Sequence, residues 1–278
     1  MKVIETVEQL KAEIKKLSGP VGFVPTMGYL HEGHMTLVRH ARTENLSVIV
    51  SIFVNPAQFG PQEDFSSYPR DTERDLALLE KEGANLIFMP TAEEMYPEGF
   101  GSWVEVNDIT ERLEGKIRPG HFKGVTTVVA KLFNIVEADR AYFGQKDVQQ
   151  LAVIRKMVKD LNMNIDIVAV PTVREPDGLA MSSRNTYLSP EERKAATVLW
   201  KSLCLARGQW ENGQRDAAQI REAMTAMIGN EPFANIDYVS IANAETLDEI
   251  EMIDRTALVS MAVRFGKTRL IDNTILGE

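Results

Sequence analysis

Short apolar segments that alternate with amphipathic segments restrict the fold of this chain more than any other feature. The apolar segments consist mostly of Val, Ile, Leu and Phe, and each of them stops at a proline, a glycine or a polar turn. Apolar runs of this length are typical of central parallel strands that are covered on both faces of a sheet. The segments that we predict to be strands are residues 21–26, 46–54, 84–89, 140–143 and 165–170.

The segments between these strands have helical spacing. In residues 33–44, for example, Met35, Val38 and Ala41 can share one apolar face. Strands that alternate with helices imply right-handed crossovers and a parallel sheet. Residues 1–175 are therefore predicted to form a Rossmann-like, doubly wound α/β domain. The predicted helices are residues 5–16, 33–44, 70–82, 125–136 and 148–161.

The order of elements changes in the rest of the chain. Two successive helices are predicted at residues 191–208 and 216–228. Strands follow at residues 236–241 and 257–263, with an extended segment through residue 270. Helices followed by strands are typical of an α+β unit. Residues 176–278 are therefore predicted to form a smaller α+β C-terminal domain.

Composition excludes several classes of function. Cys204 is the only cysteine, so the chain forms no internal disulfide, and its apolar neighbours predict a buried side chain. The formal charge of −9 argues against nonspecific binding to nucleic acid, because such binding depends on Lys and Arg that neutralise phosphates. No segment has the roughly 20 apolar residues of a membrane span, and residues 1–17 do not read as a signal peptide. We therefore expect a cytoplasmic protein that binds neither nucleic acid nor membranes.

The first candidate site joins the first long strand to the helix that follows it. Open α/β sheets bind ligands at the carboxyl ends of strands, and the start of a helix attracts phosphate through its backbone N–H groups. Two imidazoles here could donate hydrogen bonds to a triphosphate, and a glycine allows the phosphates to approach the backbone closely. The residues of this site are Met27, Gly28, Tyr29, Leu30, His31, Glu32, Gly33 and His34.

Two other interpretations of this segment are a partial metal site and an ordinary start of a helix. Zinc needs a third and usually a fourth ligand beside His31 and His34. No cysteine is near them in the sequence, and His40 and His121 do not have the spacing of ligands. We therefore predict no metal site built from the protein alone, and we favour phosphate binding.

The second candidate site follows the predicted strand at residues 140–143 and consists of Gly144, Gln145, Lys146 and Asp147. Lys146 could supply a positive charge to phosphates, and Asp147 could accept hydrogen bonds from ribose hydroxyl groups. Alternatively, Asp147 caps the next helix and Lys146 faces solvent.

The third candidate site follows the predicted strand at residues 165–170 and contains Met181, Ser182, Ser183 and Arg184. Hydroxyl groups beside a guanidinium suit an anion, although a polar turn has the same composition. The chain contains neither G-x-G-x-x-G nor the P-loop pattern G-x-x-x-x-G-K-[ST]. Dinucleotide-binding and P-loop proteins therefore lose their principal support.

Several stretches of the chain resemble the pantothenate synthetase family. Among them, the His-Glu-Gly-His of residues 31–34 is similar to the HIGH signature of nucleotidyltransferases, and residues 181–184 are similar to their KMSKS loop. The Ser-Ser-Arg of the second motif departs from the tRNA synthetases but fits this family's own pattern. The stretches are residues 25–31, 53–60, 64–70, 118–125, 143–147, 177–185 and 236–239, so the resemblance covers almost the whole chain.

The resemblance implies a two-step ligase reaction and a homodimer. ATP with Mg²⁺ would adenylate (R)-pantoate and release pyrophosphate, and β-alanine would then displace AMP to form pantothenate. The resemblance implies that residues 27–34, 144–147 and 181–184 bind ATP together with Val173. It also implies that Gln58 holds pantoate and β-alanine and that Gln150 holds pantoate. The residues that we expect to carry the reaction are His34, His31, Lys146 and Arg184.

Other functions are possible on this scaffold. Another nucleotidyltransferase would transfer a nucleotide to a phosphate or a phospho-alcohol, and a nucleotide sensor would bind ATP without releasing pyrophosphate. A tRNA-linked enzyme is disfavoured by the acidic charge and the lack of a basic stripe. The Asn-Pro-Ala-Gln of residues 55–58 and Gln150 favour a small polar acid. Residues 62–70 are either a lid over the adenylate or an ordinary surface loop, and Arg118 and His121 have no assigned role.

Overall fold

Alternate side chains of strand β2 (Val21–Thr26) pack against opposite faces of a sheet. Val24 belongs to a buried cluster with side chains of helix α2 (Glu32–Glu44), whereas Phe23 faces Phe133 with 6.5 Å between ring centroids. Both faces of the strand are therefore covered, which explains why its sequence is mostly apolar.

Strand β2 is a central member of a six-stranded sheet in the order β1-β4-β3-β2-β5-β6, in which neighbouring strands pair in parallel. The chain first runs outward through β3 and β4 and then places β5 and β6 on the other side of β2. The direction of winding therefore reverses between β2 and β5, where open α/β sheets bind ligands. The other strands are β1 (Lys2–Ile4), β3 (Ser47–Ile52), β4 (Leu86–Phe88), β5 (Arg140–Gly144) and β6 (Asp166–Val170).

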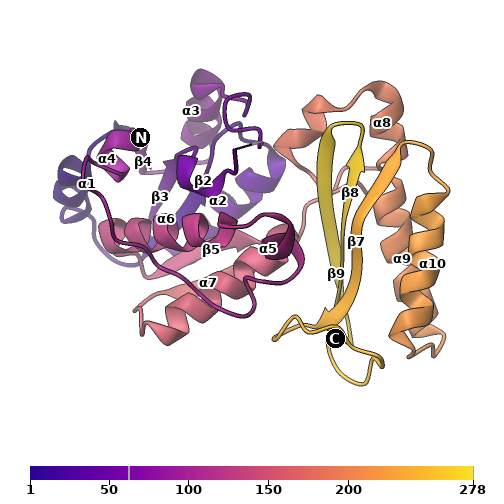
Figure 1. Cartoon of the computed structure of the whole chain (residues 1–278). Coiled ribbons are helices and arrows are strands. Elements are labelled where there is room, and N and C mark those ends of the chain that lie inside the picture. Colours follow the sequence, from indigo (N-terminus) through magenta and orange to yellow (C-terminus); the bar gives the residue numbers. More distant parts are fainter. Residues whose placement is uncertain (62, 278) are drawn as a thin grey trace. The chain divides into compact units, whose positions relative to one another are not determined.

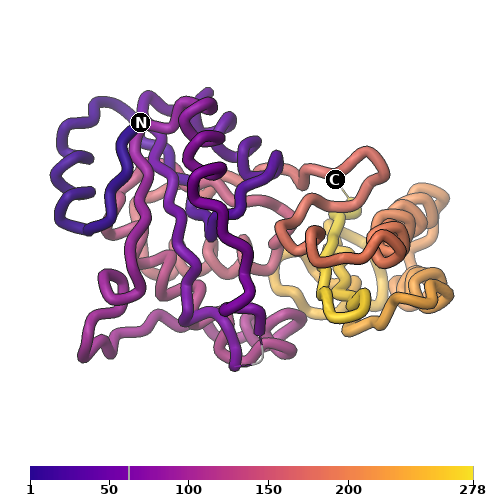
Figure 2. The backbone as a smooth tube through the Cα atoms, turned by 90° about the horizontal axis from the view of Figure 1, so that it is seen from above, coloured from indigo at the N-terminus to yellow at the C-terminus, as the bar shows by residue number. Residues whose placement is uncertain are grey.

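Helices cover both faces of this sheet (Figure 1). Side chains of α2 and α3 share one buried cluster with the strands, and α1 packs against α6. Figure 2 shows α1 as the indigo coil beside the N-terminus. The helices of this part are α1 (Val7–Ile14), α3 (Thr72–Lys81), α4 (Ala92–Met95), α5 (Leu113–Ile117), α6 (His121–Val136) and α7 (Val148–Asp160), with 3-10 turns η1 (Pro56–Gln58) and η2 (Gln145–Asp147).

The computed structural model describes residues 1–61 and 63–277 and divides into two compact units. The first unit contains Met1–Gln145 and Gln149–Pro171, and the second contains Lys146–Val148 and Thr172–Glu278. The second unit thus begins at Thr172 instead of residue 176, and it includes three residues that the sequence analysis assigned to the first domain.

The second unit packs helices α9 and α10 against one face of an antiparallel sheet of three strands in the order β7-β8-β9 (Figure 1). Alternate residues of β8, among them Val259, Met261 and Val263, belong to the same buried cluster as the helices. The predicted α/β sheet with a smaller α+β C-terminal part is therefore confirmed. The elements are η3 (Ser183–Tyr187), α8 (Pro190–Ala195), α9 (Val198–Glu211), α10 (Ala217–Gly229), β7 (Ala234–Asn243), β8 (Ala257–Phe265) and β9 (Thr268–Leu276).

Several predicted bounds differ from the structure. Strand β1 was not predicted, because three residues are too few to show a pattern, and their pairing with β4 defines them. Helix α6 begins at His121 instead of residue 125, after Gly120, which adopts a φ of 81°. The last strand reaches Leu276 instead of residue 270. Cys204 was predicted to be buried but is exposed on α9. Within the described residues, no helix is both long enough and apolar enough to cross a membrane.

Candidate active site

His31 and His34 cap the first turn of α2 with their side chains. Nδ1 of His31 accepts the backbone N–H of Gly33 at 3.1 Å, and Nδ1 of His34 accepts the backbone N–H of His31 at 3.2 Å. Because a backbone N–H can only donate, the ring proton of each histidine lies on Nε2. The ring centroids are 4.1 Å apart, with an interplanar angle of 39°. The turn therefore contains two neighbouring Nε2–H donors.

Asp75 of α3 holds the loop that precedes these histidines. Its carboxylate accepts the backbone N–H groups of Tyr29 and Leu30, each at 2.7 Å, and only 1% of the residue is exposed. Burial raises the pKa of Asp75, and the two hydrogen bonds and the charge of Arg74 offset part of this effect. Arg74 also donates to the Leu30 carbonyl at 3.0 Å and lies over the ring of Tyr29. One turn of α3 thus determines the course of the loop.

Gly28 allows the loop to approach Asp75. Its φ is +81°, and a Cβ atom there would lie 2.9 Å from Cγ2 of Ile52 and 3.1 Å from Oδ2 of Asp75. Any L-residue at this position would combine backbone strain with close contacts.

The backbone of this turn is engaged within the protein itself. The N–H of Gly28 donates to Oγ1 of Thr26 at 3.2 Å, and the N–H of Gly33 is capped by His31. The backbone N–H of Gly33, which we expected to face phosphate, is thus occupied by the side chain of His31 in this structure. The two histidine side chains, which were also predicted to bind phosphate, remain candidate donors. Of the other predicted residues, the Leu30 side chain is fully buried and the Glu32 carboxylate pairs with Arg39 at 3.1 Å.

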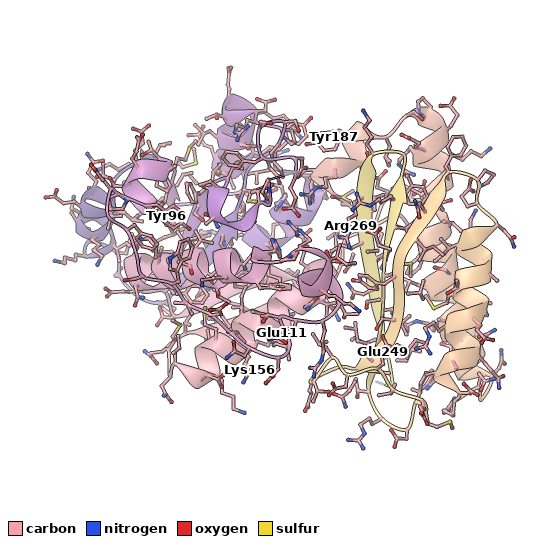
Figure 3. The ribbon with its side chains drawn as sticks, viewed as in Figure 1. Tyr96, Glu111, Lys156, Tyr187, Glu249 and Arg269 are labelled. Atoms are coloured by element: carbon pink, nitrogen blue, oxygen red, sulfur yellow. The ribbon has the colours of Figure 1, made fainter. Side chains whose placement is uncertain are left out.

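Gln58 is buried at the end of η1, where its amide contacts a residue of the first loop. Nε2 of Gln58 donates to Sδ of Met27 at 3.1 Å, and Oε1 accepts from Nδ2 of Asn55 at 3.1 Å. Asn55 is held in turn by the hydroxyl of Tyr96, which donates to its Oδ1 at 2.8 Å (Tyr96 is labelled in Figure 3). The structure therefore brings Gln58 together with Met27 and defines the orientation of its amide.

Arg118 and His121 form a chain of contacts that ends on the backbone of Gln58. Arg118 donates to both carboxylate oxygens of Glu63, with Nη2 at 3.0 Å from Oε2. Nη1 of Arg118 lies 3.0 Å from Nε2 of His121, and Nδ1 of His121 lies 2.8 Å from the carbonyl oxygen of Gln58. Since a guanidinium only donates and a carbonyl only accepts, the ring proton of His121 lies on Nδ1.

Burial and the charge of Arg118 determine the pKa values of His121 and Glu63. Burial, helped by the positive charge of Arg118, lowers the pKa of His121 to about 4. Burial alone would raise the pKa of Glu63, but its hydrogen bonds and charge interaction with Arg118 outweigh burial and lower that pKa to about 2. At neutral pH the side chain of Glu63 is therefore a carboxylate, that of Arg118 a guanidinium and that of His121 a neutral imidazole.

The neighbours Gln149 and Gln150 have different surroundings at the start of α7. Gln149 is buried, accepts the backbone N–H of Glu114 at 2.9 Å and donates to the carbonyls of Ile109 and Arg112 at 2.7 and 2.8 Å. Gln150 is half-buried and lies just beyond the carboxyl end of β5, the strand next to β2. Gln149 therefore has a structural role, which leaves the amide of Gln150 as the candidate ligand. No hydrogen bond between Gln150 and Gln58 occurs among the contacts of the described residues.

A pocket of about 240 Å³ lies in the first unit at the carboxyl ends of β2, β3 and β4. A pocket of this size can hold a small acid, an amine or a phosphate group. The residues lining it include Met27, Tyr29, Phe53, Arg70, Asp75 and Met89.

The remaining predicted residues belong to the second unit, except Gly144 and Gln145 at the end of β5. Met181 donates its backbone N–H to the carbonyl of Val173 at 3.0 Å, so these two residues lie together. Ser182 caps η3, and its Oγ accepts the backbone N–H of Arg184 at 3.3 Å. Ser183 is buried.

Lys146 is held through its backbone. Nδ2 of Asn273 donates to the carbonyl oxygen of Lys146 at 2.8 Å. Asn273 follows Asp272, which forms a bidentate ion pair with Arg174 at 2.6 and 2.9 Å. Asp147 is exposed. These contacts orient the loop that carries Lys146.

Within residues 1–61 and 63–277, no group of three or more His, Cys, Asp or Glu side chains could hold a metal ion. The buried carboxylate nearest the first loop, Asp75, already accepts two backbone N–H groups. The donors therefore do not fit a magnesium site made by protein alone, and an ion would need phosphate oxygens as ligands.

Three residues that support the site were not predicted from the sequence, namely Asp75, Glu63 and Tyr96. Asp75 had a detectable signal, because it shares the buried face of α3 with Leu79, one turn later. An acid on the apolar face of a helix needs a partner in the structure. Glu63 and Tyr96 had no such signal. Residues 62–70, interpreted either as a lid or as an ordinary surface loop, include residue 62, which is outside the described residues.

Comparison with known proteins extends over the whole chain. A family model described as pantoate-beta-alanine ligase matches residues 2–275. A pantothenate synthetase from Thermotoga neapolitana is 57% identical over 280 residues, with 100% of each chain covered. One from Acetivibrio thermocellus is 58% identical over 279 residues, with 99% of each covered.

Two solved structures are also similar. The pantothenate synthetase from Thermus thermophilus is 50% identical with a TM-score of 0.95, and 99% of each chain is covered. A pantoate-beta-alanine ligase from Francisella tularensis, complexed with beta-gamma ATP and beta-alanine, is 33% identical with a TM-score of 0.81. In that comparison 99% of this chain and 97% of the other are covered.

Proposed function

We propose that this chain, which belongs to the pantoate–β-alanine ligase family and joins pantoate to β-alanine through a carbon–nitrogen bond, first activates (R)-pantoate as an adenylate. ATP is a substrate of this ligase. A carboxylate oxygen of pantoate attacks the α-phosphorus of ATP, and the bond to pyrophosphate breaks. The amine of β-alanine then attacks the acyl carbon, loses a proton and displaces AMP.

The single observation that carries this proposal is the pair of Nε2–H donors on His31 and His34 at the carboxyl end of β2. Attack at the α-phosphorus builds negative charge on the leaving pyrophosphate, and oriented donors stabilise such charge. The hydrogen bonds at Nδ1 orient both donors before ATP binds. We assign His34 as the principal catalytic residue, with His31 beside it.

The other ATP-binding roles are part of the same proposal. Lys146 and Arg184 contribute positive charge to the phosphates, and Ser182 and Ser183 contribute hydroxyl groups. Mg²⁺, if it is required, would be supplied with ATP and would offset part of the negative charge of the phosphates. The full set comprises Met27, Gly28, Tyr29, Leu30, His31, Glu32, Gly33, His34, Gly144, Gln145, Lys146, Asp147, Val173, Met181, Ser182, Ser183 and Arg184.

Gln58 and Gln150 hold pantoate in this proposal, and Gln58 also contacts β-alanine. An amide can both donate to and accept from the hydroxyl groups of pantoate. It carries no charge, so it leaves the substrate carboxylate nucleophilic. The contacts of Gln58 with Met27 and Asn55 support a defined orientation of its amide.

A homodimer and a cytoplasmic location are further parts of this proposal, and both come from the family resemblance and the sequence. The mass of the purified protein in solution tests the first. A mass near twice 31.1 kDa agrees with a dimer, and 31.1 kDa contradicts it.

An oxygen-isotope experiment tests the adenylate. The protein is incubated with MgATP, β-alanine and (R)-pantoate that carries ¹⁸O in its carboxylate, and the products are analysed by mass spectrometry. The adenylate route transfers one ¹⁸O atom to AMP, because the carbon–oxygen bond breaks in the second step. Formation of ADP with labelled phosphate would instead indicate an acyl phosphate. ATP binding without pyrophosphate release would favour a sensor.

A further inference from the structure

The contacts that run from Glu63 through Arg118 and His121 end on the backbone carbonyl of Gln58. His121 reaches Gln58 across 63 residues of sequence, from the first turn of α6 to the last residue of η1. Its other ring nitrogen contacts Arg118, which is itself held by both oxygens of Glu63. The side chains of His121 and Arg118 therefore form one hydrogen-bonded line from a carboxylate to a backbone carbonyl.

Hydrogen bonds and close packing from different parts of the first unit hold Gln58 in place. Its side-chain amide contacts Asn55 and Met27, and its carbonyl contacts His121. The helix that carries His121 also packs closely against η1, because a Cβ atom at Gly124 would lie 2.1 Å from the carbonyl oxygen of Ala57. A short 3-10 turn has few hydrogen bonds of its own, so these supports determine where the Gln58 amide lies.

The direction of each hydrogen bond in the line is determined by chemistry. Arg118 can only donate, so Nε2 of His121 accepts, and Nδ1–H of His121 donates to Gln58. A second proton on His121 would place an N–H group against the guanidinium of Arg118. The charged groups around the ring are Arg118, Glu63 and Glu114, and the ring is neutral at neutral pH.

We propose that His121, oriented by Arg118 and Glu63, is a positioning residue that sets the Gln58 amide for the acid and amine substrates. This inference rests on the proposed role of Gln58 in binding pantoate and β-alanine. His121 itself touches no substrate in this proposal. It acts through the Gln58 carbonyl, so its effect requires the Gln58 side chain.

Two substitutions of His121 separate its two contacts. In His121→Asn, the amide nitrogen occupies the place of Nδ1 and can still donate to the Gln58 carbonyl. In His121→Gln, the longer amide occupies the place of Nε2, where it can accept from Arg118 but cannot donate to Gln58. Misplacement of a binding group by about 1 Å can cost roughly 100-fold, so we expect kcat/KM for pantoate to fall about 10- to 100-fold in His121→Gln. We expect His121→Asn to stay within about threefold of the wild type, and KM for ATP to stay within about twofold in both.

A double-mutant cycle with Gln58→Ala shows whether His121 acts through Gln58. The full-length chain is used throughout, thermal unfolding checks folding, and Lys123→Ala serves as the control. Lys123 lies on the same helix as His121, but it pairs with the exposed Glu105 at 3.3 Å and not with Gln58. We expect His121→Gln to cause no further loss of kcat/KM in the Gln58→Ala background. If His121→Gln does not fold, Arg118→Lys takes its place in the cycle, because Lys cannot bind Glu63 and His121 together as the guanidinium does.

The outcomes separate the two proposals. Loss in His121→Gln, recovery in His121→Asn and no added loss with Gln58→Ala would support positioning. Equal losses in both His121 variants, or full additivity with Gln58→Ala, would overturn it. Wild-type activity in both His121 variants, while Gln58→Ala is impaired, would also overturn it and leave the role of Gln58 intact. Full activity of Gln58→Ala would instead refute the substrate role assigned to Gln58, and the positioning proposal with it.

Discussion

His34 accepts the backbone N–H of His31 through Nδ1, at 3.2 Å, so the first histidine of the pair is held by the side chain of the second. The same bond places the proton of His34 on Nε2. One residue thus stabilises the start of α2 and supplies a proposed donor to ATP. The two roles use different ring atoms, and a substitution can separate them.

His34→Asn should keep the cap and lose the donor. The amide oxygen of Asn can accept the N–H of His31 in place of Nδ1, but nothing replaces Nε2–H. We expect kcat for pantoate-dependent pyrophosphate release to fall roughly 100- to 1,000-fold, the usual loss for one oriented donor. The melting temperature should change little. His40→Asn, on the exposed side of the same helix, is the control, and equal activity of both variants would contradict the role of His34.

Asp75→Asn should loosen the loop before the histidines. The carboxylate accepts two backbone N–H groups, whereas an amide offers one oxygen and turns its NH₂ group toward the other donor. We expect the free energy of unfolding to fall by about 2–3 kcal/mol and KM for ATP to rise. Urea unfolding measures the first quantity. The control Glu73→Gln lies on the exposed face of α3, and a loss of similar size there would refute the explanation.

Gln149→Ala should lower the stability of the protein, whereas Gln150→Ala should weaken the binding of pantoate, although the two residues are adjacent. Gln149 makes three hydrogen bonds to the backbone of residues 109–114, so its removal should lower the free energy of unfolding by about 2–3 kcal/mol. Gln150→Ala should change stability by less than about 0.5 kcal/mol but raise KM for pantoate about tenfold. Steady-state kinetics and urea unfolding of both variants provide the comparison. An unchanged KM in Gln150→Ala would remove that residue from the substrate site.

Stability should fall as the pH falls below 6.5, because the folded protein resists protonation of His121. Its pKa is lowered from 6.5 to about 4, so between these values the unfolded chain binds a proton that the folded chain does not. The loss is on the order of 3 kcal/mol, since one pKa unit corresponds to about 1.4 kcal/mol. Below pH 4.5, protonation of Glu63, whose pKa is about 2, adds a further loss in the same direction.

Urea unfolding between pH 7 and pH 4 measures this dependence, with His121→Asn as the comparison. The variant lacks the titrating imidazole but keeps a donor for Gln58. Its stability should therefore depend less steeply on pH between 6.5 and 4 than that of the wild type. Identical slopes for the two proteins would contradict the assignment to His121.

The sequence by itself predicted five of the six strands of the parallel sheet. Residues 21–26 and 46–54 are mostly apolar because both faces of β2 and β3 are covered. The motif at residues 31–34 was readable because its spacing places both histidines in one turn, and that contact is local. Local contacts leave a local pattern, which explains why the strands and the proximity of the two histidines could be predicted.

Only the tertiary structure decided how those residues are supported. Asp75 contacts Tyr29 across 46 residues of sequence, and His121 contacts Gln58 across 63. Such partners leave no periodic pattern, because the contact depends on two elements that pack together after the chain has folded. For the same reason the sequence could not show that Gln149 binds the backbone of residues 109–114, and it could not place the proton of each histidine. A ring nitrogen donates or accepts according to the group that faces it, and in His121 that group comes from another part of the chain.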